Sequence, residues 1–170
     1  MSLLTDYTSE EQILLMQGPR LGAIVVSAAS PGRSADTASE GFAAIQYAVT
    51  SRGEFLDNVL INSVLYELDQ LAKAEYRFAD YGKLAAAPGA GAQALAQLGQ
   101  IADLLDRKST PAEAAGYKRW VLNAATSASQ AAKEGGGFLG RGAVDVNDAE
   151  EAALAEIAEA LRLESARAQQ

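Results

Sequence analysis

The chain has 170 residues, with 14 basic and 22 acidic side chains and a net charge of −8, and it contains neither histidine nor cysteine. This length fits a single domain, residues 1–170, that buries its own core without disulfide or metal crosslinks. Without histidine and cysteine it holds no Ser-His-Asp or Cys-His nucleophile, no usual zinc site, no His- or Cys-ligated haem, no iron–sulfur cluster and no Glu-x-x-His di-iron centre.

Four helix starts are written in the sequence as capping boxes, in which a Ser, Thr or Asn is followed three residues later by Glu. The pairs are Thr8–Glu11, Thr37–Glu40, Thr110–Glu113 and Asn147–Glu150. Each is followed by a stretch rich in Ala and Leu, and continuous β-branched runs and Asn-Gly hairpin signals are missing from the sequence. The expected fold is therefore all-α.

The first three helices follow from apolar spacing and from the helix breakers between them. One is predicted over 8–17 and ends at Gly18-Pro19, and a second begins at Pro19, because proline fits the first turn of a helix but not its interior. A third is predicted over 37–53. Its apolar side chains at helical spacing are expected to face the core: Phe42, Ile45 and Val49.

The fourth helix, predicted over 54–80, is the longest, and it is apolar nearly all round over its first four turns. A helix without a polar face packs on several neighbours, so this one is expected to be central. The stretch 84–91 is rich in Ala and Gly and is predicted to be a linker. Three further helices are expected over 92–107, 110–133 and 147–163. The prediction is a compact bundle of about seven helices around a long central helix, with a frayed tail at 164–170.

A weak internal duplication is one explanation for the order of these elements. Residues 19–50 and 111–162 each contain an Ala-rich helix, a loop with glycine, a capping box and a second helix. The corresponding halves are 1–83 and 92–163. Convergence of two ordinary helix–loop–helix units explains the pattern as well as duplication does, so both explanations stay open.

Acidic residues bracket the glycine-rich loop GGGFLGRG, residues 135–142, and suggest a metal site. Glu134, Asp145, Asp148 and Glu150 offer the oxygen ligands that calcium, magnesium or manganese prefer. The alternative is that Glu150 completes a helix cap while Asp148 favours the helix dipole. A phosphate loop is not expected, because a Gly-Lys-Ser/Thr ending and a preceding strand are missing and the acids would repel a phosphate.

The segments AAKEG (131–135) and VNDAE (146–150) resemble the TerB-like helical proteins associated with tellurite resistance. The resemblance implies a seven-helix bundle with an acidic, metal-binding cluster near these loops, and it matches Glu134 and Glu150 to the site. The chain departs from the family pattern in three places. Glu134 replaces an aspartate, the loop is longer, and Ser30-Pro31-Gly32 stands where the first half should carry an acid.

Composition also bears on location and partners. An acidic surface repels nucleic acid and anionic lipid, and no basic amphipathic stretch is present, so neither is expected as a partner. A secretory signal is not recognisable at the start, and the longest weakly polar run, Leu21–Ala29, is far shorter than the roughly 20 residues of a spanning helix. The cytoplasm is the expected location.

We therefore expect a non-enzymatic helical protein of the bacterial cytoplasm that acts through protein–protein contact or self-association. The alternative function is a TerB-like stress-response protein that binds a divalent cation through the four acids named above. A helical enzyme that uses carboxylates and a bound metal would need the same cation site and a polar cleft besides.

Overall fold

The structure, a computed structural model, describes residues 2–29, 34–73, 81–135 and 143–163. The described residues form seven α-helices and two short 3₁₀ helices, and no strand occurs among them, which confirms the predicted all-α fold. The elements are η1 (Leu4–Asp6), α1 (Ser9–Ala29), α2 (Ser34–Thr50), η2 (Ser51–Phe55), α3 (Val59–Lys73), α4 (Tyr81–Ala85), α5 (Ala90–Lys108), α6 (Pro111–Gly135) and α7 (Ala143–Ala160).

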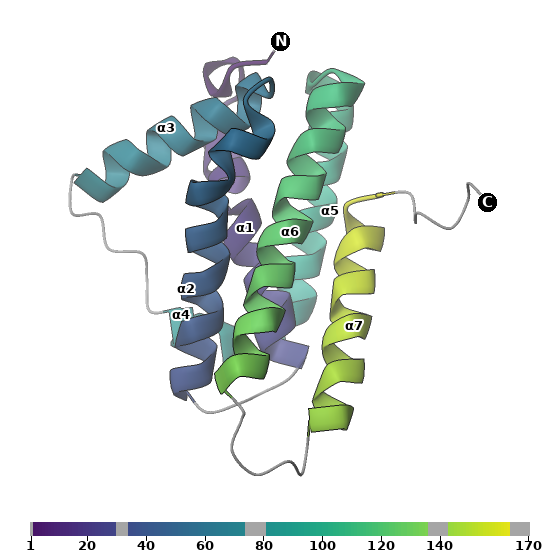
Figure 1. Cartoon of the computed structure of the whole chain (residues 1–170). Helices are drawn as coiled ribbons and strands as arrows, with labels where there is room; N and C mark the ends of the chain where they lie inside the picture. The colour runs from purple at the N-terminus through teal and green to yellow at the C-terminus, as the bar shows by residue number, and fades with distance from the viewer. Residues whose placement is uncertain (1, 30–33, 74–80, 136–142, 164–170) are drawn as a thin grey trace.

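Five of the helices form the body of the bundle, with α1 at its centre (Figure 1). Helix α1 packs against α2, α5, α6 and α7, and α2 also packs along α6. Helix α3 crosses the upper end of the bundle at a steep angle to the others (Figure 1). Helices from the first and second parts of the sequence therefore build one shared core.

Helix α6 supplies the largest side chains of this core. Tyr117 and Trp120 are both fully buried, and their rings meet edge to face with centroids 5.4 Å apart. The Trp120 indole N–H donates a hydrogen bond of 3.2 Å to the carbonyl of Ala48 on α2. On the other side of α6, Gly22 of α1 lies so close that a Cβ there would be 3.1 Å from the Cβ of Ala125. Small residues thus allow the three helices to approach closely.

The predicted break at Pro19 is wrong, because α1 runs through Pro19 without interruption. Proline has no N–H, so the carbonyl of Leu15 loses the partner that it would have in a regular helix. The Tyr117 hydroxyl of α6 donates a hydrogen bond to that carbonyl instead. A side chain 102 positions away in sequence replaces the missing backbone donor.

The predicted central helix over 54–80 is also corrected. Residues 51–55 form η2, and α3 begins only after Asn58, whose side-chain oxygen accepts the N–H of Ile61 at 3.1 Å in the manner of a helix cap. Leu60 and Val64 are fully buried, but Tyr66 is 58% exposed. The apolar side chains on the different sides of α3 are therefore not all buried. Helix α3 covers the end of the bundle, and α1 occupies its centre.

Two of the four predicted capping boxes start helices. In the first, the Thr8 N–H donates to Glu11 at 2.8 Å and the Glu11 N–H donates back to the Thr8 hydroxyl at 3.3 Å. Thr110 and Glu113 exchange the same two bonds, both of 3.3 Å, at the start of α6.

The other two pairs do not start helices, since α2 begins at Ser34 and α7 at Ala143. Glu40 and Glu150 therefore lie inside their helices.

Several smaller predictions shift or fall outside the described residues. Only 86–89 of the predicted linker lies outside a helix, and Gly89 holds the left-handed conformation (φ 75°) that begins α5. The predicted tail at 164–170, the end of the predicted fourth helix at 74–80 and most of the glycine-rich loop, 136–142, are outside the part of the chain that the structure describes.

Candidate functional site

The four acids predicted to bind a cation are only partly described. Asp148 is exposed, Glu150 is buried, and the side chains of Glu134 and Asp145 lie outside the described residues. Among the side chains that the structure describes, no three acids gather closely enough to hold a metal ion. Because only Asp148 and Glu150 of the four candidates have described side chains, the predicted cation site stays a prediction.

Glu150 has surroundings unlike those of a capping residue. Its side chain is 1% exposed, and one carboxylate oxygen accepts a hydrogen bond of 2.7 Å from the Ser129 hydroxyl of α6. The other oxygen, Oε1, is buried and has no hydrogen-bond partner among the described residues. Buried carboxylate oxygens in folded proteins are nearly always satisfied, so this atom marks a place where a further donor or a cation would be stabilising.

The α1–α2 pair contains a matching arrangement. Glu40 of α2 is 2% exposed and accepts a hydrogen bond from the Ser27 hydroxyl of α1. The hydroxyl of Tyr81, from α4, lies 2.9 Å from that of Ser27, and burial raises the pKa of Tyr81 above its usual range. Gly41 makes room for the tyrosine, because a Cβ there would lie 2.6 Å from the ring. Each helix pair thus buries one serine–glutamate hydrogen bond, and among the described residues only the first is joined by a tyrosine.

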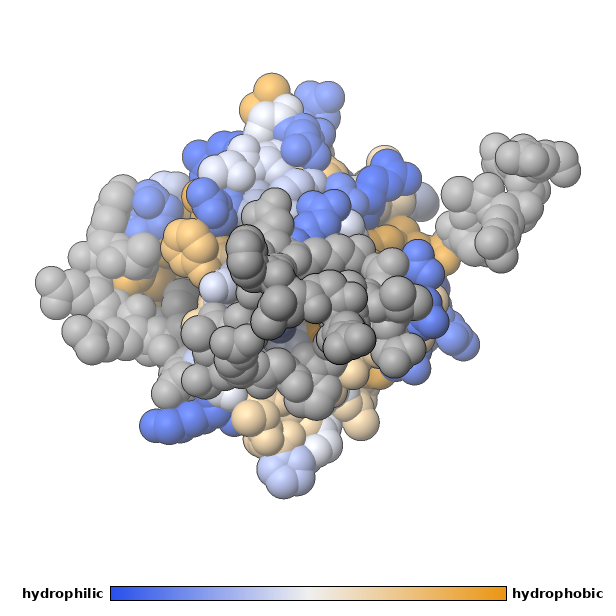
Figure 2. Space-filling model, turned by 60° about the horizontal axis from the view of Figure 1, so that its bottom comes forward, coloured by the Kyte–Doolittle hydropathy of each residue, from blue (hydrophilic) through white to orange (hydrophobic). Residues whose placement is uncertain are grey.

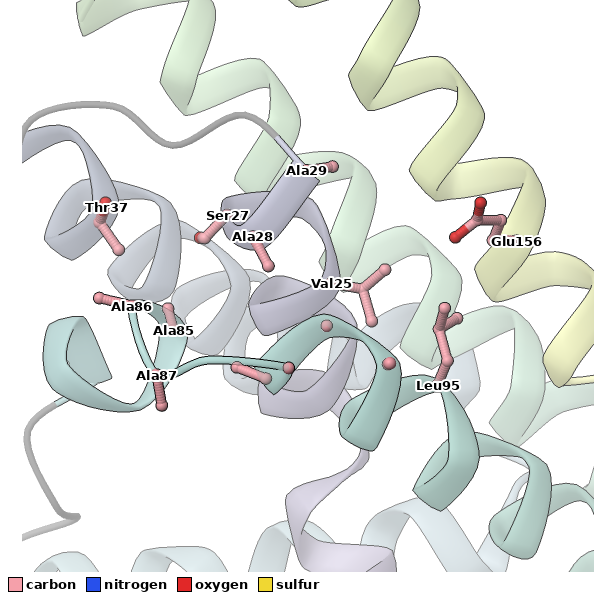
Figure 3. Close-up of a pocket in the computed structure, with 14 residues that line it drawn as sticks. Val25, Ser27, Ala28, Ala29, Thr37, Ala85, Ala86, Ala87, Leu95 and Glu156 are labelled. Carbon is pink, nitrogen blue, oxygen red and sulfur yellow. The ribbon is translucent and has the colours of Figure 1, made fainter.

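A hollow of about 510 Å³ lies beside Ser27, between α1 and the start of α5 (Figure 3). Most of its lining is alanine and glycine, from α1, α4, α5 and the turn before α5. Glu156 of α7 approaches it from one side, and Ser27 and Thr37 contribute hydroxyls (Figure 3). Its described lining residues include a single carboxylate and no basic side chain, which does not define a reaction.

A second concave site, of about 570 Å³, lies between α1, α2 and α3 and is mainly apolar. We call it the α2 groove. Its lining residues are Met16, Gln17, Arg20, Gly41, Phe42, Ile45, Val49, Arg52, Leu65, Leu68, Asp69 and Tyr81. A cavity of this size with a few polar groups is typical of sites that bind a ligand or a partner side chain.

The groove contains the apolar residues of α2 that the sequence assigned to the core. Phe42 is 69% exposed, Ile45 41% and Val49 55%, so the predicted burial of these side chains is wrong. The core instead receives Ala44 and Ala48, which are almost fully buried. Helix α2 carries two apolar stripes, and the stripe of small residues faces α6 because it allows the closer approach.

Charged side chains stand among the apolar ones. Arg20 and Asp69 already take part in interactions within the chain. Arg52 is exposed and forms no hydrogen bond or ion pair with any described residue. No sequence prediction included this site, although Phe42, Ile45, Val49 and Arg52 follow one another at the helical spacing of three, four and three residues.

Comparison with protein-family models, curated proteins and solved structures finds no match for this chain. In the described part of the chain, no helix is long and apolar enough to cross a membrane. Seen from its lower end, the molecule shows hydrophilic side chains spread among apolar ones (Figure 2).

Proposed function

We propose that this chain is a non-enzymatic protein-interaction module of the bacterial cytoplasm, and that its α2 groove binds a helix of a partner protein. The observation that carries the proposal is the line of three large apolar side chains, Phe42, Ile45 and Val49, each more than two-fifths exposed within one concave surface. Single exposed apolar residues are common, but a contiguous row in a groove is typical of an interaction site.

The spacing of the row favours a helix as the bound element. Phe42, Ile45 and Val49 follow one another by three and then four residues, which is the spacing of a helix–helix seam. Helices that bind in grooves present their own apolar residues at the same intervals. An interaction role is further supported by the absence of histidine and cysteine from the sequence.

The test compares two substitutions of the same kind. Ile45→Asp places a charge in the groove, whereas Ile13→Asp places one on an exposed site of α1, 52% exposed, that does not line the groove. Both proteins are expected to fold, because the altered side chains are largely solvated. A partner pulled down by the wild type should be kept by Ile13→Asp and lost by Ile45→Asp, and its binding segment should be helical when mapped by NMR.

Retention of the same partner by both variants would show that the groove is not the contact surface. Light scattering on the purified protein provides a separate arm: a dimer that Ile45→Asp dissociates would mean that the groove binds a second copy instead.

A second candidate function is divalent-cation binding, and the unpartnered Oε1 of Glu150 specifically favours it. The TerB-like resemblance at 131–135 and 146–150 points to the same residue. Calorimetric titration with calcium, magnesium and manganese should give binding heat that Glu150→Gln removes and that a substitution of the neighbouring exposed residue, Glu151→Gln, retains. No heat at millimolar metal would eliminate this function without affecting the proposal for the groove.

A further inference from the structure

We infer that the partner helix lies antiparallel to α2 and carries acidic residues in its first turn, where they pair with Arg52. This inference rests on the proposed function of the α2 groove and adds the direction and the charge of its occupant. It follows from the length of the groove, from the difference between its two ends and from the charge of the whole chain.

The length of the groove along α2 is set by the lining residues from Gly41 to Arg52. At 1.5 Å per residue they span about 17 Å, or three helical turns. An antiparallel partner of three turns would place apolar side chains at i, i+4 and i+7 against Val49, Ile45 and Phe42. A helix this short is marginal alone in water, so it would gain its stability mainly from burial of this apolar face.

The two ends of the groove differ chemically. At the Gly41 end lies Tyr81, whose hydroxyl is directed at Ser27 and is held in the buried serine–glutamate network. At the other end lies Arg52, exposed and without a hydrogen bond or ion pair to the residues that the structure describes. Among the described charged residues of the groove, Arg52 is therefore the one that can pair with a bound partner. It lies just beyond the C-terminus of α2.

An acidic partner is favoured at that end for two reasons. A guanidinium pairs with a carboxylate in a directional, two-pronged contact, and acidic residues are most stable in the first turn of a helix. An antiparallel arrangement brings the positive N-terminal end of the partner beside the negative C-terminal end of α2. The chain itself has a net charge of −8, so the exposed arginine at this end of the groove would select among partners.

The test uses two synthetic three-turn peptides with one apolar face, leucines at i, i+4 and i+7, and either glutamates or lysines in the first turn. Fluorescence anisotropy measures their binding to the wild type and to Arg52→Glu, Ile45→Asp and Ile13→Asp. The acidic peptide is expected to bind the wild type about two- to fivefold more tightly, the range for one exposed ion pair. Arg52→Glu should reverse this preference, and Ile45→Asp should abolish binding of both peptides.

The outcomes separate this inference from the proposed function. Equal binding of both peptides, still lost in Ile45→Asp, would leave the groove as a helix site and overturn the charge assignment. The same holds if Arg52→Glu leaves the preference unchanged. Binding of neither peptide to the wild type would overturn both proposals. A spin label at the peptide's first turn should broaden the NMR signals of residues near Arg52, and broadening near Gly41 instead would overturn the antiparallel direction.

Discussion

At the scale of single residues, Tyr117 and Pro19 form a pair that neither residue explains alone. Pro19 removes a backbone donor from the middle of α1, and the buried Tyr117 hydroxyl supplies one to the carbonyl of Leu15. Burial also raises the pKa of Tyr117 above its ordinary value, which keeps the phenol protonated and able to donate at neutral pH.

Replacing Tyr117 by Phe should lower the free energy of unfolding by about 1–3 kcal/mol, because the Leu15 carbonyl is then buried without a partner. Urea unfolding measures the change, and Tyr66→Phe, on an exposed tyrosine, is the control. In the Tyr117→Phe background, Pro19→Ala should recover part of the loss, since alanine restores the backbone N–H at that position. Wild-type stability for Tyr117→Phe would show that this hydrogen bond contributes nothing.

Gly18 is required by the same contact. A Cβ at Gly18 would lie 2.4 Å from the Tyr117 hydroxyl and 2.9 Å from a methyl group of Val121. Gly18→Ala should therefore destabilise the protein by about 1–3 kcal/mol through overpacking. The matched control is Gly99→Ala in α5, where nothing lies within 4 Å of the new Cβ.

The control should be stabilised by about 0.5–1 kcal/mol, because alanine is the better helix former. Effects of opposite sign, read from thermal or urea unfolding, are the expected result. A shift of the same sign in both variants would contradict the packing argument.

At the scale of elements, the start of α6 concentrates hydrogen bonds on one acid. Glu113 accepts bonds from the Ser2 N–H at 2.9 Å and from the Thr110 hydroxyl at 2.8 Å. Burial alone would raise the pKa of Glu113, but the bonds from Ser2 and Thr110 outweigh it and lower this pKa below the ordinary value of 4.5. This cap therefore ties the segment before α1 to the first turn of α6.

The lowered pKa predicts a pH dependence. Stability from the ionised Glu113 is fully present above pH 4.5, the unfolded-state value, and is lost as the pH falls through the lower folded-state pKa. Glu113→Gln should therefore be less stable than the wild type at neutral pH, and the difference should shrink on acidification below pH 4.5. Urea unfolding across this range tests the prediction, with Glu151→Gln as control, and a constant difference would contradict it.

The sequence predicted which segments are helical better than it predicted their ends and faces. The boxes at Thr8 and Thr110 are local, so they could be recognised from the sequence. The continuity of α1 could not, because the donor that replaces the Pro19 N–H is far away in sequence. The exposure of Phe42 could not either, since helical spacing shows two apolar stripes on α2 but not which of them a neighbour covers.

The same limit applies to the candidate sites. Glu40 and Glu150 match the capping-box pattern, but the structure buries both against serines of the preceding long helix. A glutamate about two turns inside a helix can have the same local sequence as one in its first turn. The unpartnered oxygen of Glu150 and the groove beside α2 depend on how helices pack, and only the assembled bundle shows them.

At the scale of the whole molecule, α3 lies at one end of the bundle yet belongs to the common core. Leu60, Ile61 and Val64 are fully buried within the same apolar cluster as Trp120 of α6. Because Leu65 and Leu68 of α3 also line the α2 groove, the position of this helix determines the shape of the proposed binding site.

Leu60→Ala should therefore lower the stability of the entire protein by about 2–5 kcal/mol, because it leaves a cavity in the shared core. Urea unfolding should show a lower midpoint, and hydrogen exchange should show faster global exchange in α5 and α6 as well as in α3. Faster exchange confined to α3, or a change below about 0.5 kcal/mol, would mean that α3 unfolds separately from the rest.

The hydrogen bond from Tyr117 to the Leu15 carbonyl also has a consequence for the nascent chain during synthesis. The two residues are 102 positions apart, so at synthesis rates of about 5–20 residues per second Tyr117 is added to the chain roughly 5–20 s after Leu15. During that interval neither the Pro19 nitrogen nor Tyr117 can donate to this carbonyl, so α1 lacks one hydrogen bond at its middle. On the ribosome, α1 can therefore gain this stabilising hydrogen bond only after Tyr117 has been synthesised, long after α1 itself.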